Sequence, residues 1–70
     1  MAKYYLNLTP QHTKEKEIHK DGCFWLSKAN DTEYLGEFTG CQGALAEARR
    51  RHPFQPIDGC ADCCTKCHSR

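Results

Sequence analysis

Four side chains of this sequence have the chemistry and spacing of a metal site. His19 and Cys23 are separated by three residues that include a glycine turn. Cys60 and Cys63 are separated by two residues, so each pair can fold toward one point. One imidazole and three thiolates form a closed tetrahedral set of donors that suits structural zinc. Soft sulfur ligands disfavour magnesium and calcium, so the sequence predicts Zn²⁺ as the ion.

The small size of the chain indicates why such a site would matter. Seventy residues make one small domain, and we expect residues 1–70 to form a single zinc-binding domain. Fourteen residues are large and apolar or aromatic: five Leu, two Ile, three Phe, three Tyr and one Trp. A core that thin supplies roughly 3–5 kcal/mol, whereas structural zinc contributes about 10–16 kcal/mol in small domains near neutral pH. We therefore expect the metal to be a condition of folding.

Charge and hydropathy narrow the classes of partner and the compartment. Ten basic and nine acidic residues leave a net charge of +1, which provides no strong field toward nucleic acid or a membrane. The sequence shows no apolar run with the length of a signal peptide core or a membrane span. We therefore expect a cytoplasmic monomer without a membrane partner. In the reducing cytosol, closely spaced cysteines favour metal binding or catalysis over disulfides.

Three segments have the pattern of short strands. Residues 3–8 alternate with a period of two and contain aromatics, which is typical of a half-buried strand. Residues 15–20 also alternate and are predicted to be the returning strand of a hairpin. Residues 33–38 predict a third strand, in which Gly36 marks a bulge or a close packing contact.

The clearest element is a helix that follows the third strand. Thr39 and Gln42 have the spacing of a capping box, which predicts Thr39 as the N-cap. One apolar stripe follows, made of Cys41, Ala44, Leu45 and Ala48. Pro53 ends the helix near Arg51 or His52, because the residue before a proline is pushed out of the α region. The predicted fold is α+β: a small antiparallel sheet of about three strands, one packed helix and a C-terminal Cys-x-x-Cys zinc knuckle.

The order of these motifs carries a resemblance to a known family. A strand is followed by His19 and Cys23, an extended Tyr-Leu-Gly-Glu-Phe segment, an Ala-rich helix and Gly-Cys-x-x-Cys. This order resembles the zinc domain of the Ada-type DNA-repair regulators. It is also similar to small bacterial modules and short uncharacterised bacterial proteins with a His-x-x-x-Cys site. The resemblance implies the fold and the ligands, but the Ada pattern has a methyl-accepting cysteine where this chain has His19, which argues against methyl transfer.

The surplus cysteines leave several ligand sets open. Cys64 could replace Cys63, and Cys67 or His68 could replace the histidine ligand, without violating a spacing rule. Cys41 lies on the apolar helix stripe, where a cysteine is typically a small buried residue. It could also approach Cys64 or Cys67, either as an alternative ligand or to form a disulfide under oxidation. Spacing alone does not separate these possibilities.

Two other cofactor or redox motifs occur in the same tail. Residues 64–68 match the Cys-x-x-Cys-His pattern of covalent haem attachment, which is completed outside the cytosol. Two Cys-x-x-Cys pairs are also present, but a thioredoxin-like pair is expected between a strand and a helix of a βαβ unit. We therefore rank both below zinc, and a disulfide framework second to zinc as a structural explanation.

The predicted function is a non-catalytic one. A closed set of four protein ligands leaves no position for a reactive water, so we expect no enzyme. The leading hypothesis is a small structural-zinc module with a protein or nucleic-acid partner. Arg49, Arg50 and Arg51 form the basic cluster, which favours a solvated helix C-terminus and, less strongly, a phosphate-contacting patch. The alternative is a thiol-active or disulfide-stabilised small protein that uses Cys41, Cys64 and Cys67.

Overall fold

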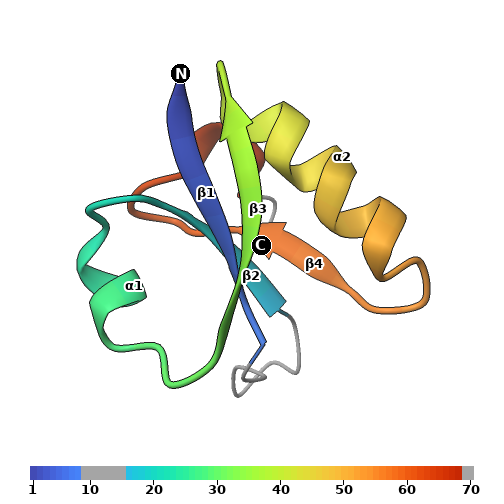
Figure 1. The fold of residues 1–70 in the computed structure, drawn as a ribbon, viewed down its shortest axis with the longest axis horizontal. Coiled ribbons are helices and arrows are strands. Elements are labelled where there is room, and N and C mark those ends of the chain that lie inside the picture. Colours follow the sequence, from blue (N-terminus) through green and yellow to red (C-terminus); the bar gives the residue numbers. More distant parts are fainter. Residues whose placement is uncertain (9–15, 69–70) are drawn as a thin grey trace.

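The computed structural model describes residues 1–8 and 16–68, which form an α+β fold with one main helix (Figure 1). In chain order the elements are β1 (Ala2–Asn7), β2 (Lys16–Lys20), α1 (Phe24–Ser27), β3 (Thr32–Phe38), α2 (Cys41–Arg51), β4 (Ile57–Gly59) and the 3₁₀ turn η1 (Thr65–Cys67). The three predicted strands are confirmed to within one residue at their described ends, while Glu15 lies outside the described residues. Within the described part, no helix is long and apolar enough to cross a membrane.

The sheet has four strands in the order β3-β1-β2-β4. β1 pairs antiparallel with β2 and β3, whereas β4 pairs parallel with β2. The prediction of an antiparallel sheet of about three strands therefore needs a correction: the sheet is mixed and includes β4. Three residues behind a proline show too little alternation to indicate a strand. A parallel pair also needs a long connection between its two strands, and here α1, β3 and α2 lie between β2 and β4.

The pairing of β2 with β4 brings the two halves of the predicted metal site together. Lys16 is paired with Ile57 and Ile18 with Gly59. The Cys60 N–H then donates to the carbonyl of Ile18 at 3.1 Å, so the next residue of β2, His19, lies beside Cys60.

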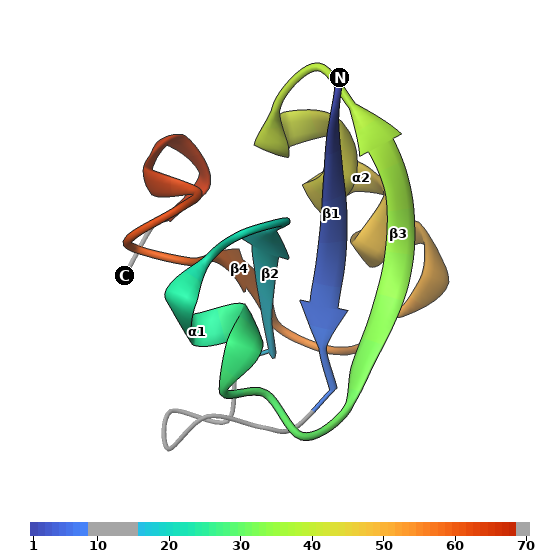
Figure 2. The same cartoon turned by 60° about the vertical axis from the view of Figure 1, so that its left-hand side comes forward.

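Successive residues of β2 point to opposite faces of the sheet, which separates core from site. Ile18 is fully buried on the side that α2 covers, together with Leu6 of β1. His19 points to the other face, where it lines a pocket together with Trp25 of α1. Figure 2 shows α1 on this side of β2. The core is completed by small residues of α2, Ala44 and Ala48, which are both fully buried.

The bulge predicted near Gly36 is confirmed in β3. Tyr4 is paired with Gly36 and Tyr5 with Tyr34, so Leu35 is the extra residue of β3. Gly36 has a φ of 125°, which L side chains rarely adopt. The bulge turns the Leu35 side chain into the core, where it is 4% exposed.

The start of α2 differs from the predicted capping box, while its end does not. Gly40, rather than Thr39, is the N-cap, and none of the described side chains caps the first turn. The predicted end near Arg51 is confirmed, because the N–H of His52 makes the last helical bond to the carbonyl of Ala48 at 2.9 Å. α1 is a single helical turn that the polar sequence after Leu26 did not predict.

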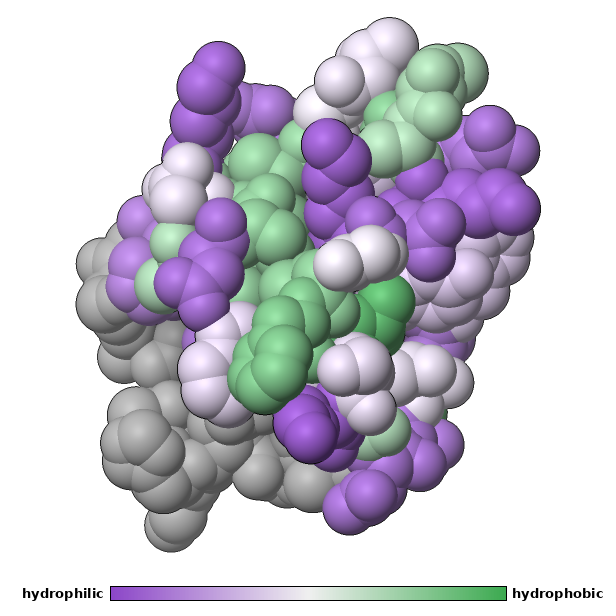
Figure 3. All heavy atoms as spheres, turned by 90° about the vertical axis from the view of Figure 1, so that its left-hand side faces the viewer, coloured by the Kyte–Doolittle hydropathy of each residue, from purple (hydrophilic) through white to green (hydrophobic). Residues whose placement is uncertain are grey.

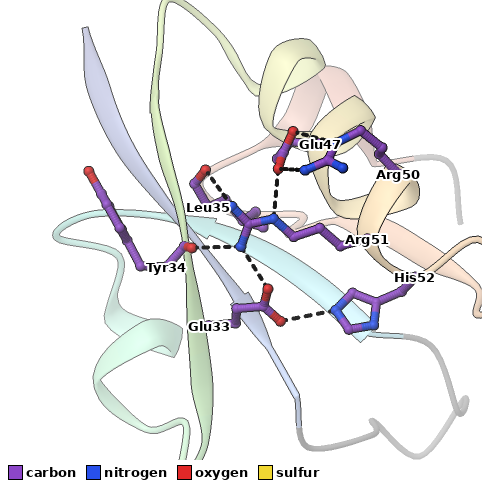
Figure 4. Close-up of polar contacts among 7 residues, drawn as sticks. All are labelled: Glu33, Tyr34, Leu35, Glu47, Arg50, Arg51 and His52. Atoms are coloured by element: carbon purple, nitrogen blue, oxygen red, sulfur yellow. Dashed lines mark hydrogen bonds and ion pairs between the residues drawn. The ribbon is translucent and has the colours of Figure 1, made fainter.

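The C-terminal turn of α2 is joined to β3 by one arginine (Figure 4). Arg51 Nε donates to Glu47 at 2.7 Å, and its Nη1 donates to Glu33 at 2.7 Å and to the Tyr34 carbonyl at 3.0 Å. Its Nη2 reaches the carbonyl of Leu35 at 3.5 Å. The guanidinium therefore links the helix to the bulged part of the strand.

The same network neutralises part of the predicted basic cluster. Hydrogen bonds from Arg50 and Arg51 lower the pKa of Glu47 to about 2. Hydrogen bonds from Arg51 and His52 lower the pKa of Glu33. Both carboxylates are therefore ionised at neutral pH, and Arg50 and Arg51 are held in ion pairs.

We expect Arg51→Gln to lower the thermal unfolding midpoint of the protein, because the bonds from Arg51 to Glu33 and the Tyr34 carbonyl are lost and the His52–Glu33 contact remains. Arg49→Gln is the matched control, since Arg49 is an exposed arginine of the same helix turn and forms no ion pair with another described residue. Differential scanning calorimetry measures both midpoints. Equal midpoints for the two variants would show that the Arg51 network adds nothing.

Candidate metal centre

The structure brings the four predicted ligands together: His19, Cys23, Cys60 and Cys63. Their candidate ligand atoms all lie within 4.8 Å of one another. Cys23 Sγ is 3.7 Å from His19 Nδ1 and 3.9 Å from Cys60 Sγ. Cys63 Sγ is 3.9 Å from His19 Nδ1. These four residues, a candidate metal site that we call the metal cluster, include residues that are 44 positions apart in the sequence.

The spacing of these atoms fits a tetrahedral ion. Zinc lies about 2.3 Å from sulfur and about 2.0–2.1 Å from imidazole nitrogen. A tetrahedron with those radii has edges of about 3.8 Å between two sulfurs and about 3.6 Å between sulfur and nitrogen. Three of the separations, at 3.7, 3.9 and 3.9 Å, are close to those edges, and the other three are at most 4.8 Å. Two thiols that touched through a disulfide would instead lie at about 2 Å.

A tight turn after β2 carries the first pair of ligands. His19 is the penultimate residue of β2, and the chain reverses at Asp21 and Gly22. Gly22 has a φ of 89°, a conformation that favours glycine at this position. The Cys23 N–H then donates to the Lys20 carbonyl at 3.0 Å, which turns Cys23 back toward the histidine.

A second turn, directly after β4, carries the other pair. Cys60 is 2% exposed and follows the last residue of the strand. Residues 61–63 form the turn, which closes when the Cys64 N–H donates to the Cys60 carbonyl at 2.9 Å. The Cys-x-x-Cys spacing thus gives the tight knuckle that the sequence predicts.

Backbone N–H groups lie near each of the three sulfurs. The Lys20 N–H donates to Cys63 Sγ at a nitrogen–sulfur distance of 3.3 Å. The N–H groups of Trp25 and Leu26 near Cys23, and of Asp62 and Cys63 near Cys60, oppose the effect of burial on the pKa of these two thiols. Such donors stabilise the thiolate form of a cysteine, because a hydrogen bond to the charged form favours it. They are what a cluster of three metal-bound thiolates needs.

The direction of each pKa shift in the metal-free cluster indicates which ligand atoms are ready to bind a metal and which must first lose a proton. Burial lowers the pKa of His19, so its imidazole is neutral at pH 7 and free to ligate. Burial raises the pKa of Cys60 and of Cys63. Burial also acts on Cys23, but hydrogen bonds from Cys63 and from backbone N–H groups outweigh it and lower its pKa. Cys23 is therefore the thiol that ionises most readily.

The second nitrogen of His19 is placed for a carboxylate partner. His19 is 1% exposed, and its Nε2 has no hydrogen-bond partner among the described residues. Glu17 Oε1 lies 4.0 Å away on the same face of β2. When Nδ1 binds a metal, Nε2 carries the proton, and metal-binding histidines commonly direct that N–H at a carboxylate. Glu17 is the side chain positioned to hold the ring in this tautomer.

The cysteines outside the cluster have separate roles in the structure. Cys41 and Cys67 form a disulfide between α2 and η1. Cys64 is a buried free thiol whose Sγ is 3.9 Å from that of Cys63, and it does not belong to the cluster. His68 Nδ1 lies 3.0 Å from the Gly59 carbonyl. The alternative ligands that spacing left open are thus placed elsewhere, and the Cys41 pairing was foreseen only as one of two options.

The fold and the cluster together define the class: a small α+β domain with a candidate site of three cysteines and one histidine. Comparison with known protein families, curated proteins and solved structures finds no match for this chain. The arguments about function below rest on the geometry of the chain itself.

We expect Cys63→Ser to abolish stoichiometric zinc binding by the reduced protein, because a neutral hydroxyl replaces one of three thiolates. Cys64→Ser is the matched control: it removes a neighbouring buried thiol and leaves the four ligands intact. Native mass spectrometry counts the zinc ions per chain. If Cys64→Ser lost zinc and Cys63→Ser retained it, the ligand would be Cys64, and the assignment of Cys63 would be wrong.

Proposed function

We propose that this chain is a structural-zinc module in which His19, Cys23, Cys60 and Cys63 hold one Zn²⁺. The observation that carries the proposal is the convergence of four N and S donors within 4.8 Å. Three sulfurs and one nitrogen select zinc among the common divalent ions. Four protein ligands fill a tetrahedral ion, so we assign the zinc a structural and non-catalytic role.

The energetics support a structural role. The part of the sheet that holds the site together is β4, which is three residues long. Fixing the backbone of each residue costs roughly 1–2 kcal/mol, which a short parallel pair recovers poorly. Structural zinc contributes about 10–16 kcal/mol in small zinc domains, enough to hold β4 and the tail on β2.

For the partner, the observations favour a protein over a nucleic acid. Phe24 and Trp25 are 61% and 49% exposed beside the metal cluster. Figure 3 shows the face that carries α1, where apolar residues gather across the middle between polar edges. Exposed aromatics of this kind are typical of protein interfaces. Arg50 and Arg51 are held in ion pairs, which leaves Arg49 of the predicted basic cluster for phosphate contacts.

Removal of the metal from the reduced protein tests the structural role. We expect a zinc chelator to abolish the dispersion of amide signals in ¹H–¹⁵N NMR spectra, and one equivalent of Zn²⁺ to restore it. The reductant is essential, because the Cys41–Cys67 disulfide would otherwise constrain the metal-free chain. Retention of the dispersed spectrum after complete zinc removal would rule out a structural metal.

The disulfide supports a second candidate function, that of a thiol-active or disulfide-stabilised protein. Cys41 and Cys67 are already bonded, and Cys64 keeps a free thiol in the same tail. The sequence presented zinc and disulfides as alternatives, but the two use different cysteines and are compatible. The cytoplasmic location stays a proposal. In that reducing compartment the Cys41–Cys67 disulfide would form only when the thiols are oxidised.

Comparing Cys41→Ser with the parent protein, with and without dithiothreitol, measures what the disulfide contributes. The bond closes a loop with a sequence separation of 26 residues, so its loss should lower the free energy of unfolding by about 3–4 kcal/mol under oxidising conditions. In dithiothreitol the two proteins should unfold at nearly the same denaturant concentration. A large difference that persists in reductant would mean that Cys41 acts through packing instead.

A further inference from the structure

A cavity of about 440 Å³ lies on the α2 side of the sheet. Lys20 points to this side because it follows His19 in β2, and successive residues of a strand point to opposite faces. One wall is residues 39–43 at the start of α2, the other is residues 63–66 of the tail, and Tyr4 and Lys20 complete it. The Cys41–Cys67 disulfide joins the two walls. Among the residues that the structure describes, no acidic residue lines this cavity. Its volume is within the range of small-molecule sites.

The first turn of α2 lines this cavity, and none of the described side chains makes a capping hydrogen bond to it. Gly40 is the N-cap, so it has no side chain with which to accept these bonds, and the first turn contains no acidic residue. The first N–H groups of a helix have no partner within the helix. They carry the equivalent of about half a positive charge and favour an anion.

Three side chains around the cavity also lack a partner. Lys20 and Lys66 form no ion pair with another described residue. Tyr4 is 5% exposed, and its hydroxyl has no hydrogen bond to another described residue, although it lines the cavity. The side chain is almost fully buried, but its hydroxyl oxygen stays accessible to solvent. The phenol can therefore donate to a ligand in the cavity that carries hydrogen-bond acceptors.

We propose that this cavity binds the dianionic phosphate group of a small molecule. The N–H groups after Gly40 and the hydroxyl of Tyr4 donate to its oxygens, and the ammonium groups of Lys20 and Lys66 balance its charge. Two cations match a phosphate monoester better than the single charge of a phosphodiester, which distinguishes a small ligand from a nucleic-acid backbone.

The neighbouring metal cluster weakens this field but does not cancel it. One Zn²⁺ with three thiolates and a neutral imidazole carries one net negative charge, and Cys63 belongs to both the cluster and the cavity lining. Two lysines and a helix N-terminus together exceed that charge. A divalent anion therefore still meets a net positive site.

Titration of the zinc-loaded, oxidised full chain with inorganic phosphate at pH 7.5 tests the proposal. We expect saturable shifts of the amide signals of Cys41, Gln42 and Gly43, with a dissociation constant on the order of 1 mM. Potassium chloride at matched ionic strength should not produce these shifts. Dimethyl phosphate, a diester, should bind at least about fivefold more weakly, and equal binding by it would overturn the proposed dianionic ligand.

Gly40→Asp is the sharpest variant. Gly40 has an extended φ of −161°, and an added Cβ would meet only the end of the Gln42 side chain, at 3.1 Å. The new carboxylate should cap α2, raise the unfolding midpoint and abolish phosphate binding. A stable Gly40→Asp protein that still binds phosphate would overturn the proposal.

Variants of the side chains test the individual contacts. Tyr4→Phe and Lys66→Gln should each weaken phosphate binding about three- to tenfold while zinc stays bound. Lys3→Gln is the matched control, because Lys3 is an exposed lysine of β1 that does not line the cavity. Equal weakening by Lys3→Gln would reduce the effect to net charge and overturn the site.

Discussion

The parallel pairing of β2 with β4 is the contact on which the metal cluster depends. It sets the Cys60 N–H on the carbonyl of Ile18, so the next side chain of β2, His19, meets the start of the knuckle. The turns after each strand then bring Cys23 and Cys63 to the same point. Three paired residues are too few to hold this arrangement by hydrogen bonds alone. A bound ion and the pairing would therefore stabilise each other.

Close backbone approach lets the tail pack on this short strand. A Cβ on Gly59 would lie 2.6 Å from that of Cys67 and 2.8 Å from the carbonyl of Cys64, so only glycine fits beside the tail. The disulfide from Cys67 to Cys41 then ties the tail to α2. Residues 60–67 therefore contribute to both faces of the sheet. They supply Cys60 and Cys63 to the metal cluster on the side of α1, and residues 63–66 to the cavity on the side of α2.

The two ends of α2 are treated differently, and this matters for function. Its C-terminal turn is fastened to β3 by Arg51, with Glu33 and Glu47 as ionised partners. Its N-terminus begins after Gly40 and has no cap from a side chain in the described part of the protein. The terminal N–H and C=O groups of a helix lack partners within the helix, and side-chain caps commonly supply them at either end. The open end faces two lysines, Lys20 and Lys66, which is why we assign it to a ligand rather than to stability.

Local patterns in the sequence determined much of this structure. Period-two and helical alternation located three strands and α2, and ligand spacing identified all four members of the metal cluster, because these signals lie within a few neighbouring residues. Tertiary structure alone decided the fourth strand, the partner of Cys41 and the exclusion of Cys64 from the cluster. Each of these depends on which distant segments meet in space, and spacing along a chain does not encode that. The N-cap at Gly40, in place of Thr39, was also established only by the structure.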